Sequence, residues 1–179
     1  MQLLLMRHLL VAVANVADLE TSVRSLYQRH GDLSGIVGPH RKALDFAKYL
    51  RNISVGHLNQ GLAVKAVEWR PELNKLLRLD EAPAFAVVSF MVLETAINTY
   101  VGDDGHRFFD SETDLMYPPD RQRFLNFLGQ TVHASLRFTE RLADIAIIEG
   151  ELADYDAAWP ELAIKAGQAD FQYLTKGRR

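Results

Sequence analysis

The spacing of apolar residues constrains the fold of this chain more than any other feature of its sequence. In the first thirty residues apolar side chains alternate four and three positions apart, which is typical of a helix that packs along one seam on a partner. The same spacing recurs from Pro119 to about Glu149, and the segment from Pro83 to Val101 is apolar on nearly every side, as in a buried central helix. The first seam comprises Leu5, Leu9, Ala12, Val16, Leu19, Val23 and Leu26, and the later one Phe124, Leu128, Val132, Ser135, Phe138, Leu142 and Ile145.

Shorter patterns predict two further helices and the connections between them. One runs from about His40 to Gly56 and the other from Ala157 to Leu174, while Ala63 to Trp69 fits either a short strand or a helical turn. We expect His30-Gly31-Asp32 to end the first helix, and the Gly and Pro residues between 35 and 39 to form a short connector. The apolar face of the second helix comprises Ala43, Phe46, Ala47, Leu50, Ile53 and Ser54.

These helices predict an all-α fold, an antiparallel four- to five-helix bundle. A chain of 179 residues is the size of one domain and buries roughly 70% of its unfolded surface, so residues 1–179 are expected to form a single domain. No repeat or linker interrupts it. Residues 175–179 carry Lys176, Arg178 and Arg179 and form a basic C-terminal tail.

Composition narrows the classes of function. The chain has no cysteine, which excludes disulfide frameworks, thiolate zinc sites and cysteine nucleophiles. The formal net charge of -3 disfavours electrostatic binding of duplex nucleic acid by the protein as a whole. Only a local basic patch could bind the phosphates. Glycine-rich phosphate loops, the HExxH zinc motif and the Gly-x-Ser-x-Gly turn are absent, so we expect neither a metal nor another cofactor.

The N-terminal segment resembles a signal peptide only superficially. Residues 12–14 have the form of a signal-peptidase site, but Arg7 and His8 interrupt the apolar run, and the remainder is too short to span a membrane. Polar residues also interrupt the apolar segment from Pro83 to Val101. We therefore expect a cytoplasmic protein that does not enter a membrane.

Glu94 and the acidic segment from Gly102 to Pro119 lead to two structural predictions. Glu94 lies within the most apolar helix, so if buried it is protonated or paired, with Arg137, His133 or Arg51 as candidate partners in a structural ion pair. The acidic segment from Gly102 to Pro119 lacks the residue order of a calcium-binding EF-hand loop and is expected to be a mobile, solvated loop.

One constellation carries a chemical prediction. The second helix ends in Tyr49-Leu50-Arg51-Asn52-Ile53-Ser54-Val55-Gly56-His57, in which Asn directly follows Arg and His comes after five intervening residues. This resembles the R-x(4 to 6)-H motif of the HEPN superfamily, all-α bundles of which many are metal-independent endoribonucleases. Arg24 and His30 have the same spacing, but Ser25 follows that Arg, and we treat this second match as fortuitous.

The resemblance implies a homodimer in which two protomers place their motifs face to face and cleave single-stranded or loop RNA. His57 would be the general acid/base, Arg51 the phosphate clamp and Asn52 the group that orients the substrate or His57. Residues 40 to 51 carry four Lys and Arg residues and one Asp, a net charge of +3, and we expect Arg41 and Lys48 to contribute to substrate binding. A role in defence or as a toxin, with an antitoxin or other protein partner, accompanies this hypothesis.

Helical geometry tests the motif within the sequence. Residues six apart on one continuous helix point about 120° away from each other, so Arg51 and His57 would not converge on one phosphate. Either Gly56 ends the helix before His57, or Arg51 of one chain works with His57 of another.

Three alternatives remain open at this point. Arg51 and Asn52 are also compatible with a solvated helix edge bearing a surface ion pair, and His57 with a helix-end residue bonded to backbone carbonyls. In a second hypothesis the chain is a catalytically silent HEPN-like module that uses the same face of the second helix to bind a nucleotide or a protein partner. In a third hypothesis the seam of the first helix drives dimerisation and the Arg/His spacing is accidental.

Overall fold

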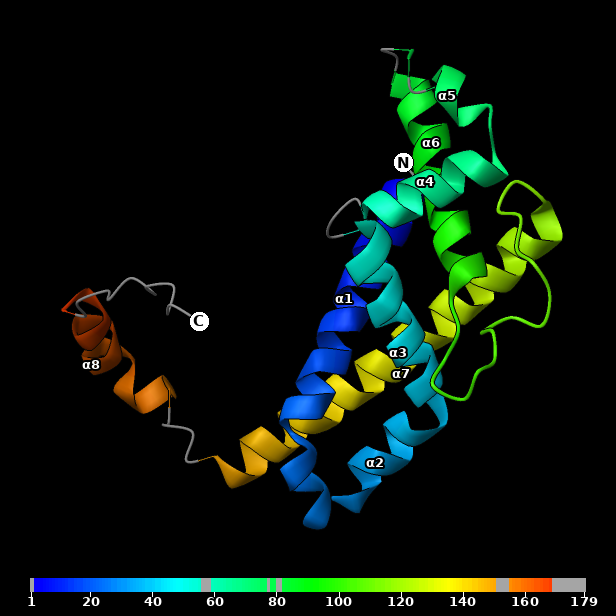
Figure 1. Cartoon of the computed structure of the whole chain (residues 1–179). Helices are drawn as coiled ribbons and strands as arrows, with labels where there is room; N and C mark the ends of the chain where they lie inside the picture. Colours follow the sequence, from blue (N-terminus) through cyan, green and yellow to red (C-terminus); the bar gives the residue numbers. More distant parts are fainter. Residues whose placement is uncertain (1, 56–58, 77, 80–81, 151–154, 169–179) are drawn as a thin grey trace. The chain divides into compact units, whose positions relative to one another are not determined.

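The computed structural model confirms an all-α helical bundle (Figure 1). It describes residues 2–55, 59–76, 78–79, 82–150 and 155–168, and these contain no β-strand. The chain divides into two compact units, residues 1–142 and 143–179, which are treated separately below; the single-domain expectation stays a prediction. The helices are α1 (Gln2–Ser22), α2 (Gly31–Val37), α3 (Arg41–Leu50), α4 (Gln60–Trp69), α5 (Leu73–Leu76), α6 (Ala82–Thr99), α7 (Pro118–Glu149) and α8 (Tyr155–Gly167), with 3-10 turns at Arg24–Gln28 and Gly38–His40 and a π-helical turn, η3, at Arg51–Val55.

Helix α1 forms, but it ends at Ser22 before a 3-10 turn rather than at residues 30–32, and the predicted seam is wrong by one position. Leu5 of that seam is 58% exposed, and Ala12 and Leu19 are exposed as well. The sequence carries two parallel series of apolar residues with the same four-three spacing, and periodicity does not choose between them. The series that the structure buries is Met6, Leu10, Val13, Ala17 and Glu20.

Helices α1 and α3 run antiparallel and pack closely (Figure 1). Ala14 and Ala17 of α1 and Ala47 of α3 are buried, and their small side chains let the two backbones approach. The two helices form the frame on which the candidate site is built.

The predicted connector between the first two helices is wrong, because residues 31–37 form α2. Leu33 and Val37, four positions apart, are both buried and fix one face of this short helix. The glycines of this region adopt ordinary helical conformations, and Gly105 is the one described residue with a positive φ, +77°. The glycines therefore did not require a break in the helix.

The segment from Ala63 to Trp69, which fits either a short strand or a helical turn by sequence, is helical. Asn59 caps α4, its Oδ1 accepting a hydrogen bond of 3.1 Å from the Leu62 amide. The helix ends at Trp69, just before Arg70 and Pro71, as the sequence predicts for the residue preceding a proline.

Glu94 is buried and paired, as expected, but the predicted partners are wrong. Arg70 donates a 2.7 Å hydrogen bond to Oε1, and the Leu115 amide donates one of 3.0 Å to Oε2. One turn later, Asn98 exchanges two hydrogen bonds with the backbone of Thr113. The polar residues of α6 therefore anchor the segment that follows it.

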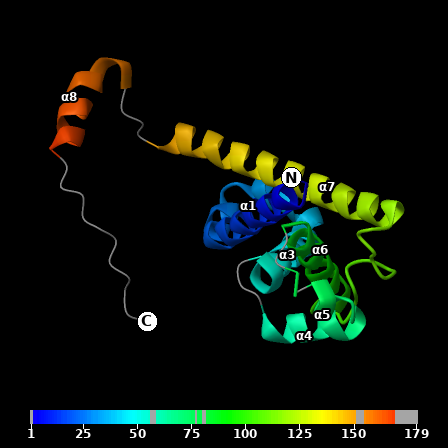
Figure 2. The ribbon, with the colours of Figure 1, turned by 90° about the horizontal axis from the view of Figure 1, so that it is seen from above.

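The loop between α6 and α7 is consequently solvated only in part: Asp103, Asp104, Asp110 and Glu112 are exposed as expected, but other residues of the loop are buried. Leu115 and Thr113 are buried, and Phe108 stacks on Phe46 of α3 with ring centroids 4.3 Å apart. Phe127 of α7 completes this aromatic cluster, 5.3 Å from Phe46. Figure 2 shows α7 lying across one side of the α1–α3 pair.

Helix α7 has the predicted extent and buries most of its predicted apolar face, including Phe124, Leu128 and Phe138. In the second unit, α8 begins close to the predicted start at Ala157 and is assigned as far as Gly167. The remainder of that predicted helix and the basic tail at 175–179 lie outside the described residues. No helix in the described ranges has the length and apolarity that a membrane span needs.

Candidate functional site

The Arg51–Asn52 pair lies on the π-helical turn η3, directly after α3. Turns of this kind occur frequently at functional sites because they change the direction in which the next side chains point. The next described helix, α4, begins at Gln60. Gly56 and His57 lie outside the described residues, so the third member of the predicted site has no described position.

The guanidinium of Arg51 is held by three oxygen atoms. Its Nε donates to Oδ1 of Asn52 at 3.0 Å, and its Nη1 donates to Asn15 at 3.2 Å and to Asp18 at 2.8 Å. The side chain is 20% exposed. Nη2 makes no hydrogen bond within the described part of the chain. The N–H groups of Nη2 are therefore available to a ligand, while the rest of the guanidinium is fixed.

The surroundings of Arg51 are basic despite the ion pair with Asp18. Lys48, one of the predicted substrate-binding residues, also pairs with Asp18, at 2.5 Å. Arg7 of α1 donates to the carbonyl of Val55 at 3.3 Å. Two cations therefore share the carboxylate of Asp18, a net charge of +1, and Arg7 adds a further cation beside the π-helical turn.

The hydrogen bond from Lys48 is the main cause that lowers the pKa of Asp18 below its ordinary value of 3.8. Partial burial opposes this shift, and the hydrogen bond from Arg51 adds to it. Asp18 is therefore ionised at neutral pH and holds both cations in place.

Arg41, the other predicted substrate-binding residue, lies about 15 Å from Arg51 along the helix axis. It donates to Glu20 at 3.1 Å, and Glu20 also accepts hydrogen bonds from Arg24 and from the hydroxyl of Tyr27. Burial by itself raises the pKa of Glu20, but the hydrogen bonds from Arg24 and Tyr27 outweigh it and the pKa lies below 4.5. The structure thus brings Lys48 to Arg51 and Asn52, and places Arg41 in a separate cluster.

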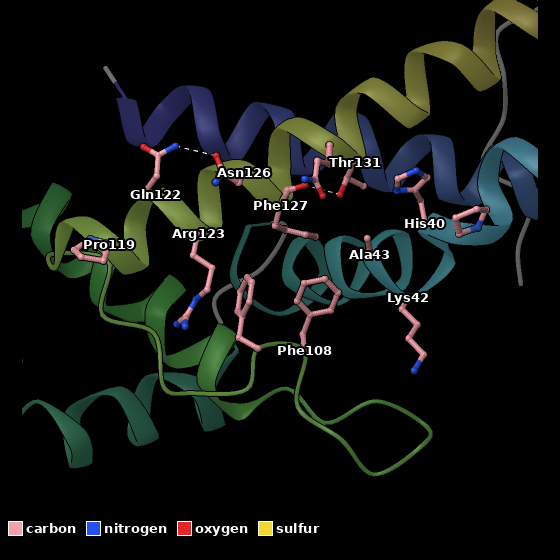
Figure 3. A pocket seen from close by; sticks show the side chains of 13 residues that line it. His40, Lys42, Ala43, Phe108, Pro119, Gln122, Arg123, Asn126, Phe127 and Thr131 are labelled. Carbon is pink, nitrogen blue, oxygen red and sulfur yellow. Dashed lines mark hydrogen bonds between the residues drawn. The ribbon is translucent and has the colours of Figure 1, made fainter.

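Sequence reasoning missed a cavity of about 690 Å³ between the start of α3, the α6–α7 loop and the first turns of α7 (Figure 3). Its residues come from three separate segments, and no local motif joins them. Two weak signals were present: the Phe108-Phe109 pair inside an acidic loop, and three carboxamides four positions apart on α7. These are Gln122, Asn126 and Gln130.

The described residues include no group of three or more His, Cys, Asp or Glu side chains that could hold a metal ion. Comparisons with protein-family models, with curated proteins and with solved structures give no match for this chain. The resemblance to the HEPN superfamily therefore stays an expectation based on the motif from Arg51 to His57.

Proposed function

We propose that this chain is a metal-independent endoribonuclease of HEPN type with a composite active site at a homodimer interface. The observation that supports the proposal is the Arg51 guanidinium, fixed by three oxygens with its Nη2 edge unused, on the turn that leads to His57. A guanidinium fixed in advance loses little conformational entropy when it binds a phosphate, and the N–H groups of Nη2 remain to donate to phosphate oxygens.

The proposed reaction is an internal transfer at phosphorus. A base removes the proton from the ribose 2′-hydroxyl, the 2′-oxygen bonds to phosphorus, and the bond from phosphorus to the 5′-oxygen breaks. An acid protonates the departing 5′-oxygen, leaving a 2′,3′-cyclic phosphate and a 5′-hydroxyl. The His57 imidazoles of the two protomers would serve as base and acid, since histidine titrates near neutral pH.

Arg51 would stabilise the negative charge that develops on the phosphorane oxygens. Asn52 is a positioning residue in this scheme, because its side-chain oxygen accepts from Nε of Arg51. Lys48 shares Asp18 with Arg51 and would move from that carboxylate to a neighbouring phosphate. Arg41 would contact the strand farther along α3.

Cleavage of synthetic single-stranded RNA in EDTA tests the proposal, with the wild type beside Arg51→Ala and His57→Ala. Arg137→Ala is the matched control, because Arg137 is exposed on α7 and makes no interaction with the described residues. We expect cleavage by the wild type and the control, loss of at least a hundredfold in both motif variants, and a dimer by light scattering. Equal cleavage by all four folded proteins contradicts the composite site. RNA cleavage by a protein that light scattering shows to be monomeric contradicts it as well.

A second candidate is a catalytically silent module that binds a nucleotide or a protein partner. The cavity between α3 and α7 favours it, because its volume falls in the range of small-molecule sites, about 300–1,000 Å³. A folded dimer that binds RNA or nucleotide without cleaving it would select this function.

The biological setting is part of the first proposal. A nuclease acting in the cytoplasm as a toxin would slow growth of the cells that express it, and its antitoxin would relieve that effect. Wild-type expression that slows growth, with normal growth for Arg51→Ala at equal protein level, supports this role; equal growth contradicts it.

A further inference from the structure

The cavity between α3 and α7 has one wall of stacked aromatic rings. Phe46 is fully buried and covers one face of the Phe108 ring, with an angle of 12° between the ring planes. Phe109 and Phe127 meet Phe108 edge to face, at 5.0 Å and 4.9 Å. Because the rings hold one another in place, a flat ligand could stack on this wall without ordering it first.

Arg123 fixes the loop that carries this wall. Its guanidinium donates to Ser111 at 2.6 Å and to Thr113 at 3.1 Å, and it lies 5.1 Å from the centre of the Phe109 ring. It also pairs with Asp120 at 3.2 Å. The Nη groups of Arg123 thus bind the protein itself, while its buried Nε has no hydrogen-bond partner among the described residues.

Carboxamides line the α7 side of the cavity. Gln122, Asn126 and Gln130 follow one another at intervals of four residues, and all three are exposed. Gln122 donates to Oδ1 of Asn126 at 2.8 Å, which leaves the amide hydrogens of Asn126 for a ligand. A carboxamide donates and accepts side by side, which is the pattern that reads the edge of a nucleobase.

The other end of the cavity is cationic. Figure 3 shows His40 and Lys42 at one end, with Phe108 and Phe127 between them and Pro119 at the other. Lys42 is 83% exposed and pairs with Asp104 on the loop. No carboxylate is among the described residues that line the cavity, but Asp104 holds Lys42 at its edge, so an anionic group would bind Lys42 by displacing that carboxylate.

From these features we propose that the cavity binds a nucleoside monophosphate unit. The base stacks beside Phe108, its edge bonds to Asn126 or Gln130, and the phosphate takes the place of Asp104 on Lys42. An acidic peptide is a poorer fit, because it has no flat face for the aromatic wall. The site is separate from Arg51, since residues 42 and 51 are nine positions apart and point to opposite sides of the helix.

The same chemistry is offered by a free nucleotide or by one residue of a single RNA strand, and only the second source rests on the proposed nuclease function. Calorimetric titration of the full chain with AMP, GMP, CMP, UMP and adenosine tests the first source. A 2′-O-methyl RNA trinucleotide, which has no attacking hydroxyl, tests the second. Binding of the trinucleotide at least tenfold tighter than any mononucleotide assigns the site to RNA, and comparable binding assigns it to free nucleotide.

Three variants test the geometry. We expect Phe108→Leu and Asn126→Ala to weaken nucleotide binding at least tenfold, and Lys42→Glu to weaken AMP binding tenfold while leaving adenosine unchanged. Lys65→Glu on α4 makes the same charge change outside the cavity and should change binding less than twofold. Since Asn126 and Lys42 are exposed, these two variants keep the test valid even if Phe108→Leu fails to fold.

The proposal is overturned if none of these ligands binds at millimolar concentration, if Lys42→Glu and Lys65→Glu act alike, or if an acidic peptide binds in their place. Failure of the cavity proposal can be distinguished from failure of the nuclease proposal. Loss of nucleotide binding with intact RNA cleavage removes only the cavity proposal, and binding without cleavage removes only the nuclease.

Discussion

The two sides of α3 are held by different interactions. Toward α7 and the preceding loop, Phe46 is fully buried among aromatic rings. Toward α1, Lys48 and Arg51 share Asp18, whose side chain is 43% exposed. Burial of a ring stabilises the fold at any pH and salt concentration, whereas half-exposed ion pairs weaken with salt and contribute little.

This contrast separates side chains that hold the fold from side chains that can exchange partners; on the aromatic side the exposed Lys42 and Asn126, not the buried Phe46, would make the polar contacts with a ligand. A side chain that the fold depends on cannot easily exchange its partners for those of a ligand. The cations facing α1 can do so, because the anion they would leave stays hydrated. The following predictions test that division of roles.

The largest effect is expected for Phe46→Ala on the aromatic side of α3. Removing a fully buried ring leaves a cavity, and substitutions of this kind cost about 3–5 kcal/mol in the free energy of unfolding. Urea denaturation measures it. The control is Phe85→Ala on α6, whose ring is 61% exposed and whose loss should cost less than about 1 kcal/mol. Equal losses in the two variants would show that the cluster is not the core of this region.

Periodicity predicted α6 and α7 well because their length averages over local exceptions. It failed to choose the buried face of α1, where two adjacent series have the same spacing. It also failed for the loop, because Phe108 reaches Phe46 through the chain's path in space, which no spacing rule records. The extent of a long helix can be predicted from its sequence, whereas the segments that pack against it cannot.

A smaller effect is expected for Glu20→Gln at the start of the α1–α3 seam. Glu20 is almost fully buried and accepts from Arg24, Tyr27 and Arg41. Glutamine keeps the shape but not the charge, so we expect a loss of about 1–2 kcal/mol in the free energy of unfolding at pH 7. A loss as large as that of Phe46→Ala would contradict the contrast between the two sides of α3.

The difference between wild type and Glu20→Gln should fade in acid. The folded-state pKa of Glu20 lies below its ordinary value of 4.5, so the carboxylate stabilises the fold above that pH. The contribution declines as the pH falls below 4.5 and is lost once the folded-state pKa is passed. Urea titrations of both proteins between pH 7 and pH 3 measure it, and a difference that stays constant would exclude the carboxylate charge as its source.

The candidate site was predictable only where its residues are neighbours in the chain. The motif placed Arg51 beside Asn52, and the structure adds the hydrogen bond between them. Asp18 and Asn15 could not be predicted, because they come from α1 and meet Arg51 only through antiparallel packing. Arg70 was missed as the partner of Glu94 for the same reason.

The smallest effect on stability, and the clearest effect on binding, is expected for Asp18→Asn. Loss of a half-exposed ion pair costs about 0–1 kcal/mol in the free energy of unfolding, but it releases Lys48 and Arg51 and raises the local charge. We therefore expect severalfold tighter binding of a 2′-O-methyl RNA strand, with a steeper dependence on salt, measured by fluorescence anisotropy. Asp32→Asn is the matched control, since it removes the same charge from the exposed pair with Arg141, away from Arg51. If both variants tighten RNA binding equally, net charge alone accounts for the effect; if Asp18→Asn unfolds the protein while Phe46→Ala does not, the roles assigned to the two sides of α3 are reversed.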